Sequence, residues 1–167
     1  MKKIQVLLFI VFISLCFTSC NKSDRKENTS MQSKNINQSD YQAESPKKSL
    51  VIEANGKKLY ASFEDNSSAE ELAKRLSSGS ISVNMNDYGD FEKVGSLPWD
   101  LPRNDSRITT QPGDIILYQG NQITIYYGTN TWNFTKLAKI NNISREELLD
   151  VLGKDDVVVK FYVGQNE

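Results

Sequence analysis

The sequence contains no histidine among its 167 residues. Histidine is the most frequent general base and a common zinc ligand, so its absence excludes Ser-His-Asp and Cys-His catalysis and histidine zinc sites. Cysteine is almost as scarce, since only Cys16 and Cys20 occur. Beyond Cys20 the chain therefore has no disulfide, thiolate nucleophile or cysteine metal site. Few classes of enzyme remain, and we expect neither a metal nor a cofactor.

A short apolar run opens the chain. Two lysines precede apolar residues from Ile4 to Phe17, a length too short to span a bilayer of about 30 Å comfortably. The run ends in Phe17-Thr18-Ser19-Cys20, which resembles the bacterial lipobox, where small residues precede a cysteine that becomes diacylated. We expect residues 1–19 to be a lipoprotein signal peptide, with acylated Cys20 anchoring an exported protein to the lipid bilayer of the bacterial envelope, on its periplasmic face or the cell surface. The alternative is an ordinary cleaved signal in which Cys20 is incidental.

Residues 20–48 are rich in Asn, Ser, Gln and Lys and have scarcely an apolar side chain. Such a segment buries too little surface to offset the entropy of ordering, so it is predicted to be a disordered tether. Asn21 to Lys48 carries 6 basic and 4 acidic residues, a net charge of 6 − 4 = +2, whereas Ser49 to Glu167 carries 12 and 17, a net charge of 12 − 17 = −5. Because an acidic domain is a poor partner for nucleic acid, no nucleic-acid binding is expected.

Two hairpins organise the folded part, which is predicted to span residues 49–164. Gly120-Asn121 joins the β-rich runs of one hairpin and Asn55-Gly56 those of the other, since Gly and Asn tolerate the positive φ angles of tight turns. A two-residue turn sets Gln119 opposite Gln122 and gives the first hairpin two faces. The expected core face holds Ile116, Tyr118, Ile123 and Ile125, and the other holds Ile115, Leu117, Thr124 and Tyr126.

Two helices are predicted from capping signals. A Ser-x-x-Glu box after Asn66 opens a short amphipathic helix, and Ser144-Arg145-Glu146-Glu147 opens a second that ends at Gly153.

The last strand, Asp156 to Val163, is expected to pair with the first. About eight strands and two helices favour a mainly β fold, a closed antiparallel barrel, because closure removes exposed strand edges. An open sandwich is the alternative.

Four short motifs carry a family resemblance. They are Asn55-Gly56, the segment from Leu97-Pro98 to Leu101-Pro102, Pro112-Gly113-Asp114-Ile115-Ile116-Leu117-Tyr118, and Lys136-Leu137-Ala138-Lys139-Ile140. The chain resembles the bacterial cyclophilin-like family from about Leu50 to Val163, which implies the eight-stranded cyclophilin-type barrel with two short helices. It does not imply prolyl isomerase activity, because the Phe-His-Arg segment of those enzymes is absent. No catalytic residue is carried over.

The longest irregular segment predicted in the domain runs from Gly95 to Gln111. It combines Trp99, two prolines, Arg103 and Arg107, a mixture that suits peptide recognition. Trp99 would supply apolar area while an arginine donates to a peptide carbonyl or carboxylate. The alternative is a barrel lid in which Trp99 packs into the core and the charges face water.

Tyr118, Tyr126 and Trp132 complete the candidate ligand-binding residues. Tyr118 could join Trp99 and Phe134 in a proline pocket, and Tyr126 could form an aromatic platform with Trp132, although core packing is the alternative for each. Three nearby acids, Asp87, Asp90 and Glu92, lack calcium-loop spacing and are interpreted as turn residues. We predict a non-catalytic module that binds a peptide, protein or small ligand, with a peptidyl-prolyl isomerase as the alternative. The oligomeric state is not predicted.

Overall fold

The computed structural model describes residues 48–165. The predicted signal peptide, Cys20 and all of the predicted tether except Lys48 lie outside these residues. In chain order the elements are β1 (Lys48–Ala54), β2 (Lys57–Phe63), α1 (Ser67–Ser77), β3 (Ile81–Tyr88), β4 (Glu92–Ser96), β5 (Ser106–Thr109), β6 (Asp114–Tyr118), β7 (Gln122–Tyr126), β8 (Thr131–Lys139), α2 (Arg145–Leu152) and β9 (Val157–Gln165).

Eight of these strands close into a ring. The antiparallel order is β2-β1-β9-β3-β4-β7-β6-β8, and β8 returns to β2 through the pairs Ser62–Lys139 and Phe63–Ala138. The predicted eight-stranded barrel with two short helices is confirmed, as is the pairing of the last strand with the first. A ninth strand, β5, joins the outer part of β8 and lies within the segment that was predicted to be irregular. Pro98 and Pro102 precede β5 and stand outside every strand, as their missing N–H donors require.

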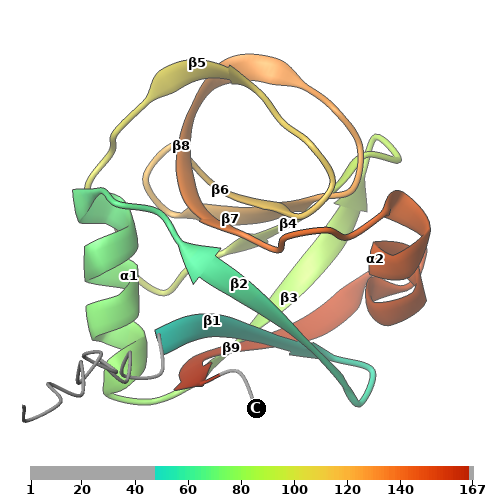
Figure 1. The fold of residues 1–167 in the computed structure, drawn as a ribbon, viewed down its shortest axis with the longest axis horizontal. Coiled ribbons are helices and arrows are strands. Elements are labelled where there is room, and N and C mark those ends of the chain that lie inside the picture. Colours follow the sequence, from blue (N-terminus) through green and yellow to red (C-terminus); the bar gives the residue numbers. More distant parts are fainter. Residues whose placement is uncertain (1–47, 166–167) are drawn as a thin grey trace, which may run out of the picture. The chain divides into compact units, whose positions relative to one another are not determined.

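The barrel encloses one large apolar core. Its strands contribute alternate side chains, and both helices add apolar residues from outside the ring. In Figure 1, α1 and α2 flank the barrel on opposite sides. The core includes Leu50, Ile52, Leu72, Val83, Leu117, Ile125, Leu148 and Phe161.

The two hairpin turns differ in length. Ala54 pairs with Lys57 across Asn55 (φ 51°) and Gly56 (φ 75°), so the predicted two-residue turn is confirmed. In the second hairpin Tyr118 pairs with Gln122, which leaves a three-residue loop with positive φ at Gln119 and Gly120. The predicted register of this hairpin is therefore wrong.

The change in register reassigns the faces of β6 and β7. Because side chains alternate along a strand, adding one residue to the loop moves the partners of one strand to the opposite face. The barrel core takes Ile115, Leu117, Ile123 and Ile125. The outer face takes Ile116, Tyr118, Thr124 and Tyr126.

The helix caps explain where both helices begin. Ser144 and Glu147 form the predicted capping box of α2, with side chain and backbone bonded in both directions. At α1 the N-cap is Asn66, whose Oδ1 accepts from the backbone N–H groups of Ser68 and Ala69, so the predicted Ser-x-x-Glu box is wrong. The extended backbone of Asn66 places its amide where these two N–H groups need an acceptor. Its Nδ2 also donates to the carbonyl of Lys136, which ties α1 to β8.

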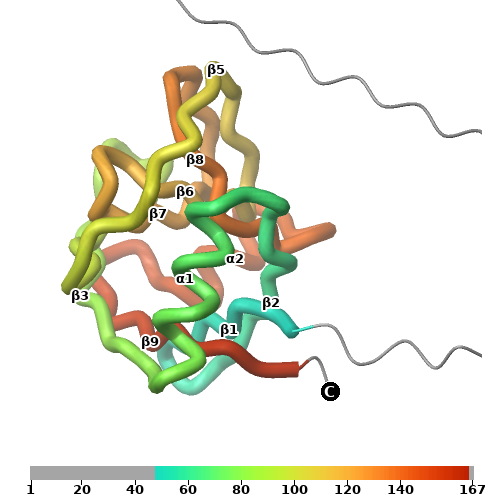
Figure 2. Tube along the Cα trace, turned by 90° about the vertical axis from the view of Figure 1, so that its left-hand side faces the viewer, coloured from blue at the N-terminus to red at the C-terminus, as the bar shows by residue number. Residues whose placement is uncertain are grey.

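A second, smaller layer lies outside the barrel. The second half of β8, from Thr135 to Lys139, pairs with β6, and its first half, from Thr131 to Phe134, pairs with β5. The first half of β8 and β5 together form an arch. Figures 1 and 2 both show this arch on the side of β6 and β7 that faces away from β1 and β9. Ile116, Tyr126 and Phe134 form a separate buried cluster there, with Phe91, Ile108 and Tyr118 packed against it. Neither helix within residues 48–165 has the length and apolar character needed to cross a membrane.

Candidate ligand-binding site

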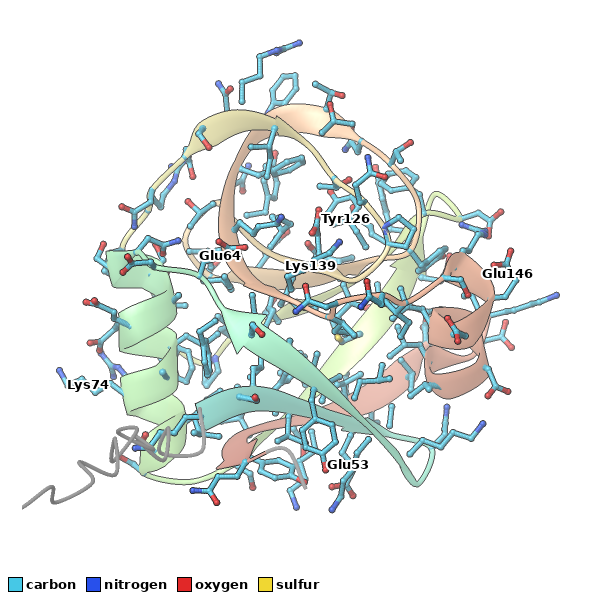
Figure 3. All side chains as sticks on the ribbon, viewed as in Figure 1. Glu53, Glu64, Lys74, Tyr126, Lys139 and Glu146 are labelled. Atoms are coloured by element: carbon cyan, nitrogen blue, oxygen red, sulfur yellow. The ribbon has the colours of Figure 1, made fainter. Side chains whose placement is uncertain are left out.

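The outer face of β4, β7, β6 and β8 holds a hollow of about 380 Å³, which we call the aromatic hollow. Figure 3 labels Tyr126 within the outline of the arch, on the opposite side of β6 and β7 from Glu53. The position of the hollow follows from the register of the second hairpin, which turns Tyr118, Thr124 and Tyr126 outward. The lining residues are Tyr88, Phe91, Glu92, Val94, Tyr118, Gln122, Thr124, Tyr126, Asn130, Trp132 and Phe134.

Five aromatic rings form a continuous series around the aromatic hollow. Phe91 and Tyr126 stack with centroids 6.0 Å apart, and Tyr126 lies 5.7 Å from Phe134. Tyr118 meets Phe134 edge to face at 6.2 Å, and Tyr88 meets Phe91 in the same way at 6.0 Å. Each such pair stabilises the arrangement by about 0.5–1.5 kcal/mol beyond area burial, so the wall is ordered before any ligand arrives.

The rim of the aromatic hollow exposes large apolar side chains to solvent. Tyr88 is 60 % exposed and Trp132 is 56 % exposed, and only Val158 joins them among the exposed large hydrophobic residues of the described chain. Two exposed aromatic residues bordering one hollow are what a binding surface needs, because Trp and Tyr supply much of the free energy at binding hot spots.

Two buried polar groups in the wall lack hydrogen-bond partners. Glu92 is 8 % exposed and Thr124 is 2 % exposed, and neither Glu92 Oε2 nor Thr124 Oγ1 has a partner within residues 48–165. Both point to the same face, because Glu92 pairs across strands with Tyr126 and Thr124 pairs with Val94. Each unsatisfied buried group costs about 1–3 kcal/mol, so the fold carries a penalty that a bound ligand would relieve.

The ionisation of Glu92 is perturbed by the same environment. Burial raises the pKa of the Glu92 carboxyl, and the adjacent Tyr126 hydroxyl offsets part of that increase. Burial and the neighbouring Glu92 raise the pKa of Tyr126 as well, which keeps its hydroxyl uncharged. Perturbed acids in clefts are typical of functional sites, and here the perturbed acid also carries an unused acceptor atom.

A second, polar hollow of about 640 Å³ adjoins the first and shares Tyr118 and Trp132 with it. We call it the arginine hollow, because Arg103 and Arg107 both line it. Arg103 is paired with Asp105, whose other oxygen accepts a 2.6 Å hydrogen bond from Thr135. Arg107 forms no ion pair with any described residue. The arginine hollow therefore offers one guanidinium ready to donate to a ligand.

The structure brings five of the six predicted ligand-binding residues together. Tyr118 and Trp132 lie between the two hollows, Tyr126 lies in the aromatic hollow, and both arginines line the arginine hollow. Trp99 is the exception, because it packs against the barrel core with the Arg75 guanidinium 5.7 Å from its ring centroid. Leu97 and Leu101 beside it are buried in the same core, as a lid would require.

Sequence reasoning missed Glu92 and Thr124. Glu92 was grouped with Asp87 and Asp90, but those two acids lie elsewhere: Asp87 bonds Lys93 and Tyr127, and Asp90 pairs with Arg145. Glu92 and Val94 share a strand face, but the pairing of β4 with β7, which brings Thr124 and Tyr126 beside them, had no signal in the sequence.

The residues that line both hollows lie within a segment that matches a known protein family. The sequence model of the cyclophilin-like family matches residues 52–162, a span that runs from within β1 to within β9. A search of curated proteins returned no match to the chain.

Proposed function

Because the chain belongs to the cyclophilin-like family, we propose that it is a lipid-anchored, non-catalytic module of the bacterial cell envelope. Its barrel binds a peptide or small ligand across the aromatic and arginine hollows. One observation carries this proposal: Glu92 and Thr124 present unpartnered polar atoms inside a wall of aromatic rings. A ligand that fills the hollow gains apolar contact with the rings and removes the cost of these two unsatisfied atoms.

The division of the surface suits a ligand with both apolar and polar parts. The exposed ring of Trp132 offers area at low entropic cost, and the neighbouring Arg107 offers donors for a carbonyl or carboxylate. Affinity would come from the aromatic hollow, while the arginine hollow would fix the orientation of the ligand.

A prolyl isomerase is the second candidate, and the position of Arg107 favours it. The Arg107 guanidinium, which has no ion pair with any residue from 48 to 165, lies in a hollow that Tyr118 and Trp132 also line. Prolyl isomerases of the cyclophilin class use an arginine to bond the proline amide. Against catalysis stands the lack of the Phe-His-Arg segment, since the chain has no histidine. We therefore place binding first.

A peptide assay separates these two functions. Purified protein is offered a proline-containing test peptide, and isomerisation and binding are measured in the same samples. We expect binding without acceleration above the uncatalysed rate, and Trp132→Ala should weaken that binding by about 2 kcal/mol, roughly 30-fold. Val158→Ala, which trims an exposed apolar residue on β9, is the matched control and should leave affinity unchanged. Acceleration that is lost in Arg107→Ala would establish the isomerase instead.

The lipid anchor has its own test, which does not depend on the ligand. Mass spectrometry of the mature protein should find an acylated Cys20 as its first residue. Cys20→Ala should leave the protein unprocessed or released from the membrane, because acyl chains supply the anchoring free energy. Cys16→Ala is the control, since Cys16 lies within the predicted signal and would be removed with it. An unmodified mature N-terminus at any other residue would contradict the lipoprotein proposal.

A further inference from the structure

The charge of the aromatic hollow has one sign. Among residues 48–165, no lysine or arginine lines it, and Glu92 is the only acid that does. The surrounding aromatic rings add to this, because the faces of such rings carry negative electrostatic potential. The hollow is thus built to favour a cation.

The unpartnered atoms specify which kind of cation fits. Carboxylate Oε2 of Glu92 needs a donor, and the hydroxyl oxygen of Thr124 can accept one as well. A primary ammonium has three N–H donors around one nitrogen, which is enough for both atoms. A quaternary ammonium has none, and a guanidinium is a planar fork that matches two oxygens of one carboxylate better than one carboxylate oxygen and a hydroxyl.

The hollow also selects for an apolar stem next to that ammonium. The half-buried rings of Phe91 and Tyr118 supply surface above the buried rings of Tyr126 and Phe134, and exposed Trp132 lies between them and the arginine hollow. A long alkyl stem packs well on such a surface while its charged end reaches a partner. Beyond the stem, a chain with further polar groups would lie near Arg107, which can donate to a carbonyl.

We infer that the aromatic hollow binds the lysine side chain of a peptide, with the lysine ammonium donating to Glu92 and Thr124. This inference rests on the proposed ligand-binding function and names its substrate class. The lysine stem lies against Phe91 and Tyr118, and the peptide backbone continues past Trp132 to Arg107. Binding supplies a donor to Glu92 Oε2, which has no partner among residues 48–165, and pairs the negative charge of Glu92 with a positive one.

Peptides that differ at one side chain test the inference. Pentapeptides blocked at both ends carry lysine, norleucine or arginine at the centre, and calorimetry measures their Kd values for the purified protein. Norleucine keeps the alkyl stem but has no charge. We expect the lysine peptide to bind at least tenfold more tightly than either of the others. The free amine n-butylamine, which has the stem and ammonium without a backbone, should bind at least tenfold more weakly than the lysine peptide.

Variants of the protein locate the effect. Glu92→Gln keeps the size of the side chain and should remove the preference for lysine over norleucine, with little change in the affinity for norleucine. Glu146→Gln, on the exposed surface of α2, is the matched control and should keep the preference. If Glu92→Gln does not fold, Thr124→Val removes the other acceptor at nearly constant volume and should reduce the preference about threefold.

The outcomes that overturn the inference differ from those that overturn the proposed function. Equal binding of the lysine and norleucine peptides would refute ammonium recognition but leave a peptide-binding groove. Equal binding of n-butylamine and the lysine peptide would refute the peptide as occupant. A tighter arginine peptide would refute the choice of ammonium over guanidinium. If no peptide binds and Trp132→Ala alters nothing, the proposed function fails as well.

Discussion

Replacing Glu92 by glutamine should stabilise the protein at neutral pH, and the structure gives the size of the effect. Glu92 is 8 % exposed, and its Oε2 has no partner within the described residues. An unsatisfied buried charged group costs more than a neutral one, for which the cost is about 1–3 kcal/mol. Because the amide of glutamine is neutral but still polar, we expect a gain of about 1–2 kcal/mol. For a domain of this size that corresponds to a Tm increase of roughly 4–8 °C.

The gain should disappear in acid. Burial raises the pKa of Glu92 in the folded state above its ordinary value, so the folded state binds this proton more tightly than the unfolded state. The penalty is complete above the folded pKa and shrinks as the pH falls from there to the unfolded pKa, below which both states are protonated. The facing hydroxyl of Tyr126 does not alter this, because burial and the neighbouring Glu92 raise the pKa of Tyr126 and keep it uncharged.

Thermal melts of three proteins at pH 7 and near pH 4 check this reasoning. The wild type and Glu92→Gln should differ at pH 7 and converge towards pH 4. Glu146→Gln changes the same side chain on the exposed surface of α2 and should shift stability by less than about 0.5 kcal/mol. If Glu92→Gln is less stable than the wild type at pH 7, the carboxylate has a stabilising partner in the folded protein. That result would refute both the claim that Glu92 Oε2 is unsatisfied and the inference that it binds an ammonium.

Three further substitutions probe the framework around the site, each measured by urea denaturation. Gly95→Ala should cost about 2–3 kcal/mol, since the added Cβ would lie 2.6 Å from the carbonyl oxygen of Asn84 on the neighbouring strand; a loss under 0.5 kcal/mol would contradict this packing. Lys93→Met should cost about 3 kcal/mol, because the fully buried Lys93 ammonium pairs with Asp87 at 2.6 Å; an unchanged midpoint would show that the pair contributes nothing. Asn66→Ala should cost about 1–2 kcal/mol through loss of the α1 cap, whereas Asn66→Asp should retain most of it.

Local chemistry made much of the fold predictable. Asn55-Gly56 specifies a two-residue turn by conformational preference alone, and Ser144 with Glu147 specifies a helix start. Apolar alternation in the last strand likewise indicated which residues reach the core. These features depend on a few neighbouring residues, so no tertiary contact was needed to infer them.

The face of the central hairpin was less predictable. Gly120-Asn121 suits a two-residue loop, and both faces of the hairpin are apolar, so hydrophobicity did not discriminate between registers. The actual loop also includes Gln119, a non-glycine residue at positive φ, which sequence preference disfavours. This single residue decides whether Ile115 or Ile116 enters the barrel, and with it whether Tyr118 shares the outer face with Thr124.

The candidate site was predictable only in part, because its aromatic residues have recognisable chemistry while its acid does not. Tyr118, Tyr126 and Trp132 invited a binding interpretation from their large aromatic side chains alone. Glu92 is one of 21 acidic residues in the sequence, and its position beside the aromatic hollow follows from its cross-strand pairing with Tyr126. Trp99 attracted attention for the same reason as Trp132, yet the segment around it closes over the barrel core.

The first and last described strands run side by side, with Lys48 opposite Gln165. Figures 1 and 2 place β1 and β9 at one pole of the domain and the β5–β8 arch at the other. A chain attached ahead of Lys48 therefore joins the domain at the pole opposite the two hollows. A fluorescent protein fused ahead of Lys48 would likewise join the domain away from the hollows, and the proposed ligand binding should persist in such a fusion.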